Sequence, residues 1–216
     1  MKARFAVLGL SLSLTLATTA TAAPFVYQHD DGTFESYWSY TAGNDVSLGN
    51  LFTAVPGGGI LQSISFFWSP NAAVGTQFTL AVFDDPNDDN SLGDAVLLTS
   101  FNTVLAAGDL NSWATYNIPL TAVSGVFYVM LYAENGPGGD LIGADTTAPW
   151  SNLGRGIQTN FSFAQAPGAA VPLGNTEAAI RATAVDAVPE PASLLLLGAG
   201  LSGLARVRAR RRQAGR

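Results

Sequence analysis

The sequence predicts an all-β protein: an antiparallel β-sandwich, jelly-roll-like, flanked by an N-terminal signal peptide and a C-terminal transmembrane helix. Two observations predict the sandwich. Short runs rich in β-branched and aromatic residues alternate with turns of Gly, Pro, Asn and Asp. No stretch of the central region keeps the apolar period of a helix over the length of a typical one. Apolar segments next to basic residues at the two ends predict the flanking elements.

The N-terminus has the three parts of a secretory signal peptide. Lys2 and Arg4 precede an uncharged segment, 5–17, and small residues follow it. Ala20 and Ala22 stand where signal peptidase recognises small side chains, which places the cut after Ala22. We therefore expect residues 1–22 to direct export through a translocon and to be removed by signal peptidase.

Residues 23–187 are expected to form the sandwich. Phe78, Leu80 and Val82 alternate with other positions and predict a strand with one buried face, whereas the run 127–132 is apolar throughout and predicts a strand buried on both faces. The strands that we expect are 25–29, 34–40, 47–55, 60–68, 77–84, 95–105, 113–119, 126–134, 156–163 and 177–185.

The predicted sandwich is strongly acidic and contains no cysteine. Arg155 and Arg181 are the only basic residues in 23–188, against fifteen acidic ones, so the formal net charge is −13. Such a charge repels phosphate backbones, and we expect no nucleic-acid partner. Without disulfides the domain has to depend on its hydrophobic core, for which it is large enough.

The last 29 residues, 188–216, form a tail in three parts. Val188, Pro189, Glu190 and Pro191 predict an accessible linker, because proline is excluded from helix interiors and central strands. The uncharged segment 192–205 predicts a transmembrane helix of about 21 Å, short for a bilayer core. Five closely spaced arginines in 206–216 are expected to stay in the cytoplasm and so set the topology: Arg206, Arg208, Arg210, Arg211 and Arg212.

This tail resembles the PEP-CTERM sorting signal of Gram-negative bacteria, which is also labelled the ice-binding protein C-terminal domain. In that family an exosortase, a membrane protease, recognises and cuts the signal. The resemblance implies an exported protein, an inner-membrane intermediate, and a final place at the cell surface or outside the cell, in a system associated with exopolysaccharide and biofilm. An ordinary tail anchor or a buried core helix is the alternative interpretation.

The resemblance implies nothing about what the sandwich itself does. Its opening, Asp30-Asp31-Gly32, and its closing, Ile180-Arg181-Ala182, loosely resemble sandwich domains of exported bacterial surface proteins. This favours a non-enzymatic binding or structural module, with exopolysaccharide as the expected partner.

The loop 84–94 is the strongest candidate for chemistry. Asp85, Asn87 and Asp89 fall at alternate positions, as oxygen ligands do at the start of an EF-hand-type calcium loop, and Asn90 tolerates the left-handed turn usually given to Gly. Val96, however, stands where such a loop has its closing glutamate. The loop is therefore either a calcium site or a solvated connection rich in turn-forming residues.

The sequence shows no recognisable catalytic constellation. His29 is the only histidine, and we expect it to be structural, because no Gly-x-Ser-x-Gly elbow accompanies it. A polysaccharide-active hydrolase that uses two carboxylates is the alternative function. Among the tryptophans, Trp68 and Trp113 are expected in the core, and Trp150 is expected to be exposed and able to stack on a sugar ring.

Overall fold

The computed structural model describes residues 23–134, 136, 138–147, 154–159, 171–172 and 176–186, of which 154–159 and 171–172 are described by their backbone. Residues 22–187 form one compact unit. The predicted signal peptide, 1–22, and the tail, 188–216, lie outside the described residues.

Three antiparallel sheets make up this unit. A four-stranded sheet has the order β1 (Pro24–Tyr27), β13 (Ile180–Asp186), β4 (Gly59–Phe67), β7 (Trp113–Val123). A six-stranded sheet has the order β11 (Val171–Pro172), β10 (Gly154–Thr159), β3 (Asp45–Thr53), β8 (Val126–Ala133), β5 (Gln77–Asp85), β6 (Val96–Val104). A small sheet has the order β12 (Glu177–Ala178), β9 (Gly139–Asp145), β2 (Ser36–Tyr40). Among the described residues the one helical element is a short 3₁₀ turn, η1 (Ala107–Asp109).

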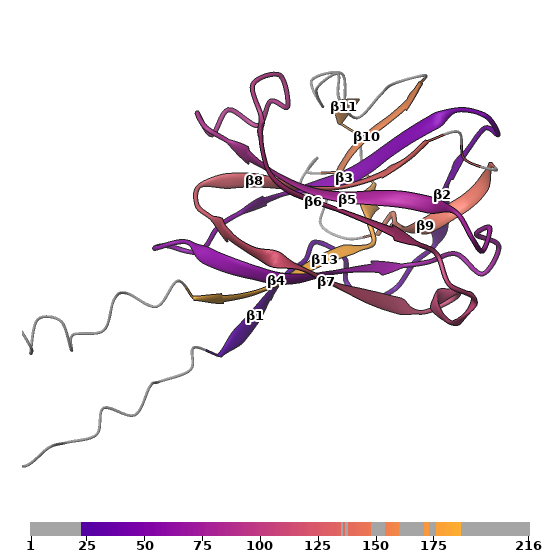
Figure 1. Cartoon of the computed structure of the whole chain (residues 1–216), viewed down its shortest axis with the longest axis horizontal. Helices are drawn as coiled ribbons and strands as arrows, with labels where there is room; N and C mark the ends of the chain where they lie inside the picture. Colours follow the sequence, from indigo (N-terminus) through magenta and orange to yellow (C-terminus); the bar gives the residue numbers. More distant parts are fainter. Residues whose placement is uncertain are drawn as a thin grey trace, which may run out of the picture. The chain divides into compact units, whose positions relative to one another are not determined.

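The two larger sheets form layers, visible in Figure 1 with β3, β5, β6 and β8 above β4, β7 and β13. The sheet with the order β1-β13-β4-β7 lies opposite the strands β3-β8-β5-β6 of the other sheet. Consecutive strands of the chain often belong to different sheets, so the chain crosses repeatedly between the two layers. This interleaving of Greek keys is typical of jelly-roll sandwiches. All the pairs of neighbouring strands in the described ranges are antiparallel. The prediction of an all-β antiparallel protein is confirmed.

The main core lies between these two sheets. Phe78, Leu80 and Val82 of β5 are buried in it, as their alternation predicts, opposite Ile64 and Phe66 of β4. Each fully buried side chain of this size contributes about 1.5–3 kcal/mol through the apolar area that it removes from water. Trp68 is fully buried in the same core, which confirms its prediction, and its indole Nε1 donates to the hydroxyl of Tyr116 at 3.0 Å.

Strand β8 is buried on both faces, as the uninterrupted apolar run predicts. Phe127, Val129 and Leu131 belong to the main core. Tyr128 and Met130 face the other side of the sheet, where they join a second apolar cluster. Its remaining members are Leu51, Ala81, Phe83, Leu92 and Val126.

The sequence missed one strand and ended another too early, and most other expected boundaries differ from the observed ones by one or a few residues. Strand β9 was not predicted, because the Gly and Asp residues at its ends indicate turns in the sequence. Strand β7 does not end at Pro119 but continues to Val123. It lies at the edge of its sheet, and its pairing with β4 is interrupted by a bulge between Leu61 and Ser63, so the missing N–H of proline breaks no regular ladder.

The two ends of the domain are joined. Strand β1 pairs with β13, with Pro24 opposite Val185. The guanidinium of Arg181 on β13 pairs with the fully buried carboxylate of Asp30, with its Nε 3.1 Å from Asp30 Oδ2, and lies 4.0 Å from the ring centroid of Trp113. Trp113 is thereby half-buried on the outer face of the sheet, so its predicted place in the core was wrong.

Asn50 is expected to be critical for stability. It is fully buried, and its amide donates to the carbonyl of Ala178 at 2.8 Å and accepts from the N–H of Ala178 at 3.2 Å. Asn50→Ala leaves both backbone groups without these partners and should lower the free energy of unfolding by about 2–4 kcal/mol. Chemical denaturation measures the change. The exposed Asn117→Ala on β7 is the control, and equal stability of the two variants would contradict the assignment.

Candidate functional site

The loop that joins β5 to β6, residues 86–95, has a well-defined backbone. Asp88 and Asn90 have φ angles of 55° and 64°, in the left-handed region that Asp and Asn adopt more readily than other non-glycine residues. The expectation that Asn90 takes a left-handed turn is confirmed. These two reversals fold the loop back on itself after Asp85, the last residue of β5.

Hydrogen bonds from backbone N–H groups hold the acidic side chains of this loop. Asp85 Oδ2 accepts from the N–H of Asn90 at 2.8 Å, and Asp89 Oδ1 accepts from the N–H of Ser91 at 2.8 Å. Asn87 bonds twice to Asp89: its Oδ1 accepts from the Asp89 N–H at 3.1 Å, and its Nδ2 donates to Asp89 Oδ2 at 3.2 Å. The carboxylates are thus fixed in direction and still present lone pairs to a further partner.

The loop is also attached to the central strand. Asp88 Oδ1 accepts from the N–H of Val126, the first residue of β8, at 2.6 Å. Leu92 is 4% exposed and belongs to the second apolar cluster, against which Ala95 also packs. The loop therefore covers the part of the outer face of the six-stranded sheet where the second apolar cluster lies.

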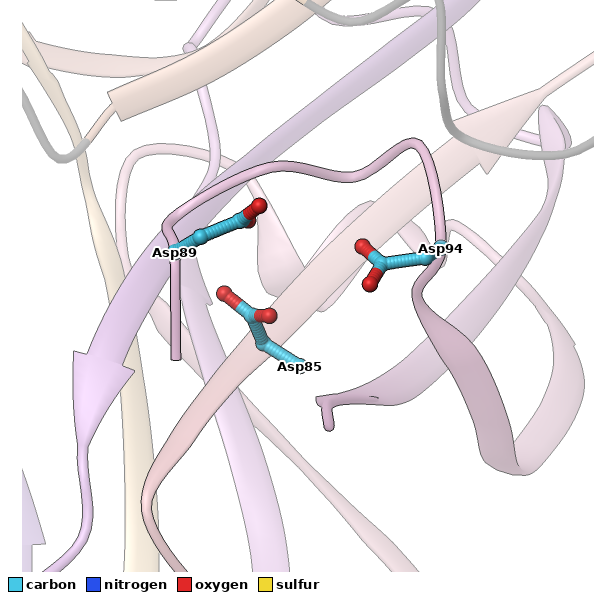
Figure 2. Close-up of side chains that lie close together, drawn as sticks. All are labelled: Asp85, Asp89 and Asp94. Atoms are coloured by element: carbon cyan, nitrogen blue, oxygen red, sulfur yellow. The ribbon is translucent and has the colours of Figure 1, made fainter. Parts of the chain in front are cut away.

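Three carboxylates converge inside the loop. One oxygen each of Asp85, Asp89 and Asp94 lies within 4.8 Å of the others, and Figure 2 shows the three side chains directed toward one another. The sequence predicted Asp85 and Asp89 together with Asn87. Asp94 was missed as a ligand because it falls outside the alternating pattern, and only the curvature of the loop brings it back to Asp85.

The local charge affects a neighbouring group. Burial raises the pKa of Asp84, and the nearby carboxylates of Asp88 and Asp85 raise it further. Negative charge is thus concentrated at this end of the β5–β6 hairpin.

The other end of the same hairpin borders an open groove. A pocket of about 490 Å³ crosses β5, β6 and β8, and a second one of about 460 Å³ adjoins it through Gln77 and Glu134. The floor is polar: Thr79 Oγ1 donates to Asn102 Oδ1 at 2.8 Å, and the hydroxyl of Tyr132 donates to Asp45 Oδ2 at 3.2 Å. Sequence reasoning missed this groove, because its residues come from strands far apart in the chain and form no motif.

His29 has a structural environment. Its Nε2 donates to the carbonyl oxygen of Leu51 at 2.6 Å, and its ring stacks on Phe52 with the centroids 4.7 Å apart. Within the described residues, no hydrogen bond is seen between His29 and a carboxylate or a serine hydroxyl of the kind that a catalytic triad requires. These contacts agree with the structural role expected for His29.

The other predicted site residues lie outside the described residues. These are the sugar-stacking candidate Trp150, the cleavage-site residues Ala20 and Ala22, the linker 188–191 and the arginines of 206–216. Within the part of the chain that the structure describes, no helix has both the length and the apolar character that a membrane span requires.

Comparison with known families decides the nature of the tail. Residues 187–212 match the PEP-CTERM protein-sorting motif. The chain carries a PEP-CTERM sorting motif. The match begins one residue before Val188 and covers the predicted linker, the apolar segment and most of the arginines, so the resemblance seen in the sequence is confirmed. A PEP-CTERM motif indicates an exported protein that is sorted to the cell surface, with an exosortase as its processing partner.

Solved structures that are similar to this chain include two structures of one protein, Cwp84. One is a clostridial cysteine protease, Cwp84, after propeptide cleavage, with a TM-score of 0.48 and 14% identity over 76% of this chain and 40% of that one. The other comprises the cysteine protease and lectin-like domains of Cwp84, a surface-layer-associated protein of Clostridium difficile, with a TM-score of 0.44 and 14% identity over 76% of this chain and 36% of that one. The chain spans less than half the length of these proteins, and it contains no cysteine. No curated protein matches its sequence.

Proposed function

We propose that the protein is a surface or matrix component of a Gram-negative bacterium. Signal peptidase removes residues 1–22 during export through the translocon, and the segment 192–205 holds the chain in the inner membrane with its arginines in the cytoplasm. An exosortase-like protease then cuts near 188–191 and releases the folded domain. The PEP-CTERM match at 187–212 carries this proposal.

The released sandwich acts, on this proposal, as a non-enzymatic module associated with exopolysaccharide. The groove across β5, β6 and β8 supports it, since Gln77, Asn102 and Tyr132 offer amide and hydroxyl groups of the kind that bind sugar hydroxyls. The net charge of −13 opposes an anionic polymer and favours a neutral one. The alternative function is a secreted polysaccharide-active hydrolase, which would cleave the polymer as well as bind it.

Processing can be followed by the intact mass of the protein in the culture medium and in membranes. The released form should lack both 1–22 and the basic tail. Glu190→Ala, or deletion of 206–216, removes part of the signal and should move most of the protein to the membrane fraction. Asp186→Ala removes an equivalent charge four residues before Glu190 and should leave release unchanged. If the Glu190→Ala variant were released into the medium as efficiently as the wild-type protein, exosortase-type processing would be contradicted.

Binding can be tested with exopolysaccharide purified from the producing strain. Gln77→Ala and Asn102→Ala each remove hydrogen-bonding groups from the groove and should weaken binding about 2- to 10-fold, as expected for about 0.5–1.5 kcal/mol per bond. Isothermal titration calorimetry measures the affinity, with the exposed Thr115→Ala on the opposite sheet as the control.

Sugar release is measured in the same samples. Binding without release supports the non-enzymatic module. Release of reducing ends that disappears in Glu134→Gln would instead establish the hydrolase, and unchanged binding in both groove variants would exclude this groove as the binding site.

A further inference from the structure

The acidic β5–β6 loop carries an inference independent of the sorting function and of the groove, which lies at the opposite end of the hairpin. We propose that Asp85, Asp89 and Asp94 bind one calcium ion. Calcium takes oxygen ligands at about 2.3–2.6 Å, so that two ligands on opposite sides of one ion lie about 4.6–5.2 Å apart. The three carboxylate oxygens, all within 4.8 Å of one another, fit around a single ion of this size.

Asp85 provides the second observation. Its side chain is 2% exposed, and one of its oxygens, Oδ1, is buried without a hydrogen-bond partner. Its other oxygen accepts a hydrogen bond from the N–H of Asn90. The full negative charge of this buried carboxylate is therefore stabilised by one neutral hydrogen-bond donor. A buried carboxylate oxygen without a donor is costly, because burial removes its hydration. A cation between Asp85 and the two exposed carboxylates supplies the missing partner.

The chain offers no basic side chain of its own for this task within the described residues. Arg181 is the one Lys or Arg side chain whose contacts the structure describes, and it pairs with Asp30. Meanwhile Asp89 and Asp94 bring two more negative charges next to Asp85. Carboxylates at such separations repel one another unless a cation screens them.

The ligand set favours calcium over magnesium. Three carboxylates, two of them exposed and open to water, leave positions for water or backbone oxygens, and calcium accepts six to eight oxygens in flexible geometry. Magnesium requires a near-ideal octahedron at about 2.0–2.1 Å and releases its own water reluctantly. Exported modules typically bind calcium in the range of about 10⁻⁴–10⁻³ M. The ion would connect the end of β5, through Asp85, to the residues that lead into β6, through Asp94.

The full-length chain, purified in detergent and freed of metal with EDTA, is titrated with calcium chloride by calorimetry and melted at each concentration. One ion per chain is expected. At about 100 times the dissociation constant, the melting temperature should rise by about 5–10 °C. Magnesium chloride at the same concentration should give a clearly smaller rise, and sodium chloride of equal ionic strength should give almost none.

Asp85→Asn and Asp94→Asn should each weaken calcium binding at least 10-fold and abolish most of the temperature rise. Asp94 is exposed, so its substitution leaves the metal-free melting temperature nearly unchanged and separates binding from folding. Asp84→Asn is the matched control, because it removes the same charge from the adjacent position of β5. Successive side chains of a strand point to opposite faces of the sheet, so Asp84 lies on the other face from Asp85. This variant should keep most of the calcium-dependent rise in melting temperature.

Three results would overturn the proposal: no calcium binding, calcium binding that survives in both Asp85→Asn and Asp94→Asn, or equal responses to calcium and magnesium.

Discussion

The fold depends on the burial of β8 on both of its faces. One face is covered by the opposing sheet, which is the ordinary arrangement in a sandwich. The other face carries Tyr128 and Met130 and is covered by the β5–β6 loop, whose Leu92 completes the second apolar cluster. A central strand without polar positions therefore requires a structured loop above it, and a solvated connection with no fixed conformation would leave these side chains in water.

This requirement explains why the acidic β5–β6 loop is held in one conformation by several hydrogen bonds. Asp88 ties the loop to the first N–H of β8, and Asp85 accepts from the N–H of Asn90 where the chain reverses. In both contacts a side-chain carboxylate accepts a hydrogen bond from a backbone N–H group. These bonds fix the shape of the loop, but they also place several negative charges above an apolar surface. Fold and charge are thus in conflict at this point, and the calcium ion that we propose would reduce the repulsion between these carboxylates.

Much of this architecture could be predicted from local sequence. The alternation in β5 and the uninterrupted apolar run of β8 gave the buried faces correctly, because strand periodicity depends only on neighbouring residues. The left-handed turn at Asn90 was predictable for the same reason. Strand β9 was not, because its Gly and Asp residues favour turns locally and become extended only through pairing with β2 and β12. The place of Trp113 depended on Arg181 and Phe34, which no local pattern connects to it.

The candidate sites differ in the same way. Asp85 and Asp89 were predictable because they are close in sequence, whereas Asp94 and the groove depend on how the hairpin curves and which strands become neighbours. The PEP-CTERM motif could be recognised from the sequence alone, because a sorting enzyme recognises such a signal as a linear segment.

The position of the proposed cuts relative to the strands follows from the pairing of β1 with β13. Strand β1 begins at Pro24, two residues after Ala22, and β13 ends at Asp186, two residues before Val188. Cuts after Ala22 and near 188–191 therefore both fall outside the paired strands, in which Pro24 lies opposite Val185. Because neither cut removes a strand or a residue of the Asp30–Arg181 ion pair, the domain can fold before processing and keep the same contacts after it. Processing then changes only what the domain is attached to, and a sorting signal of this kind needs no particular activity in the domain that it sorts.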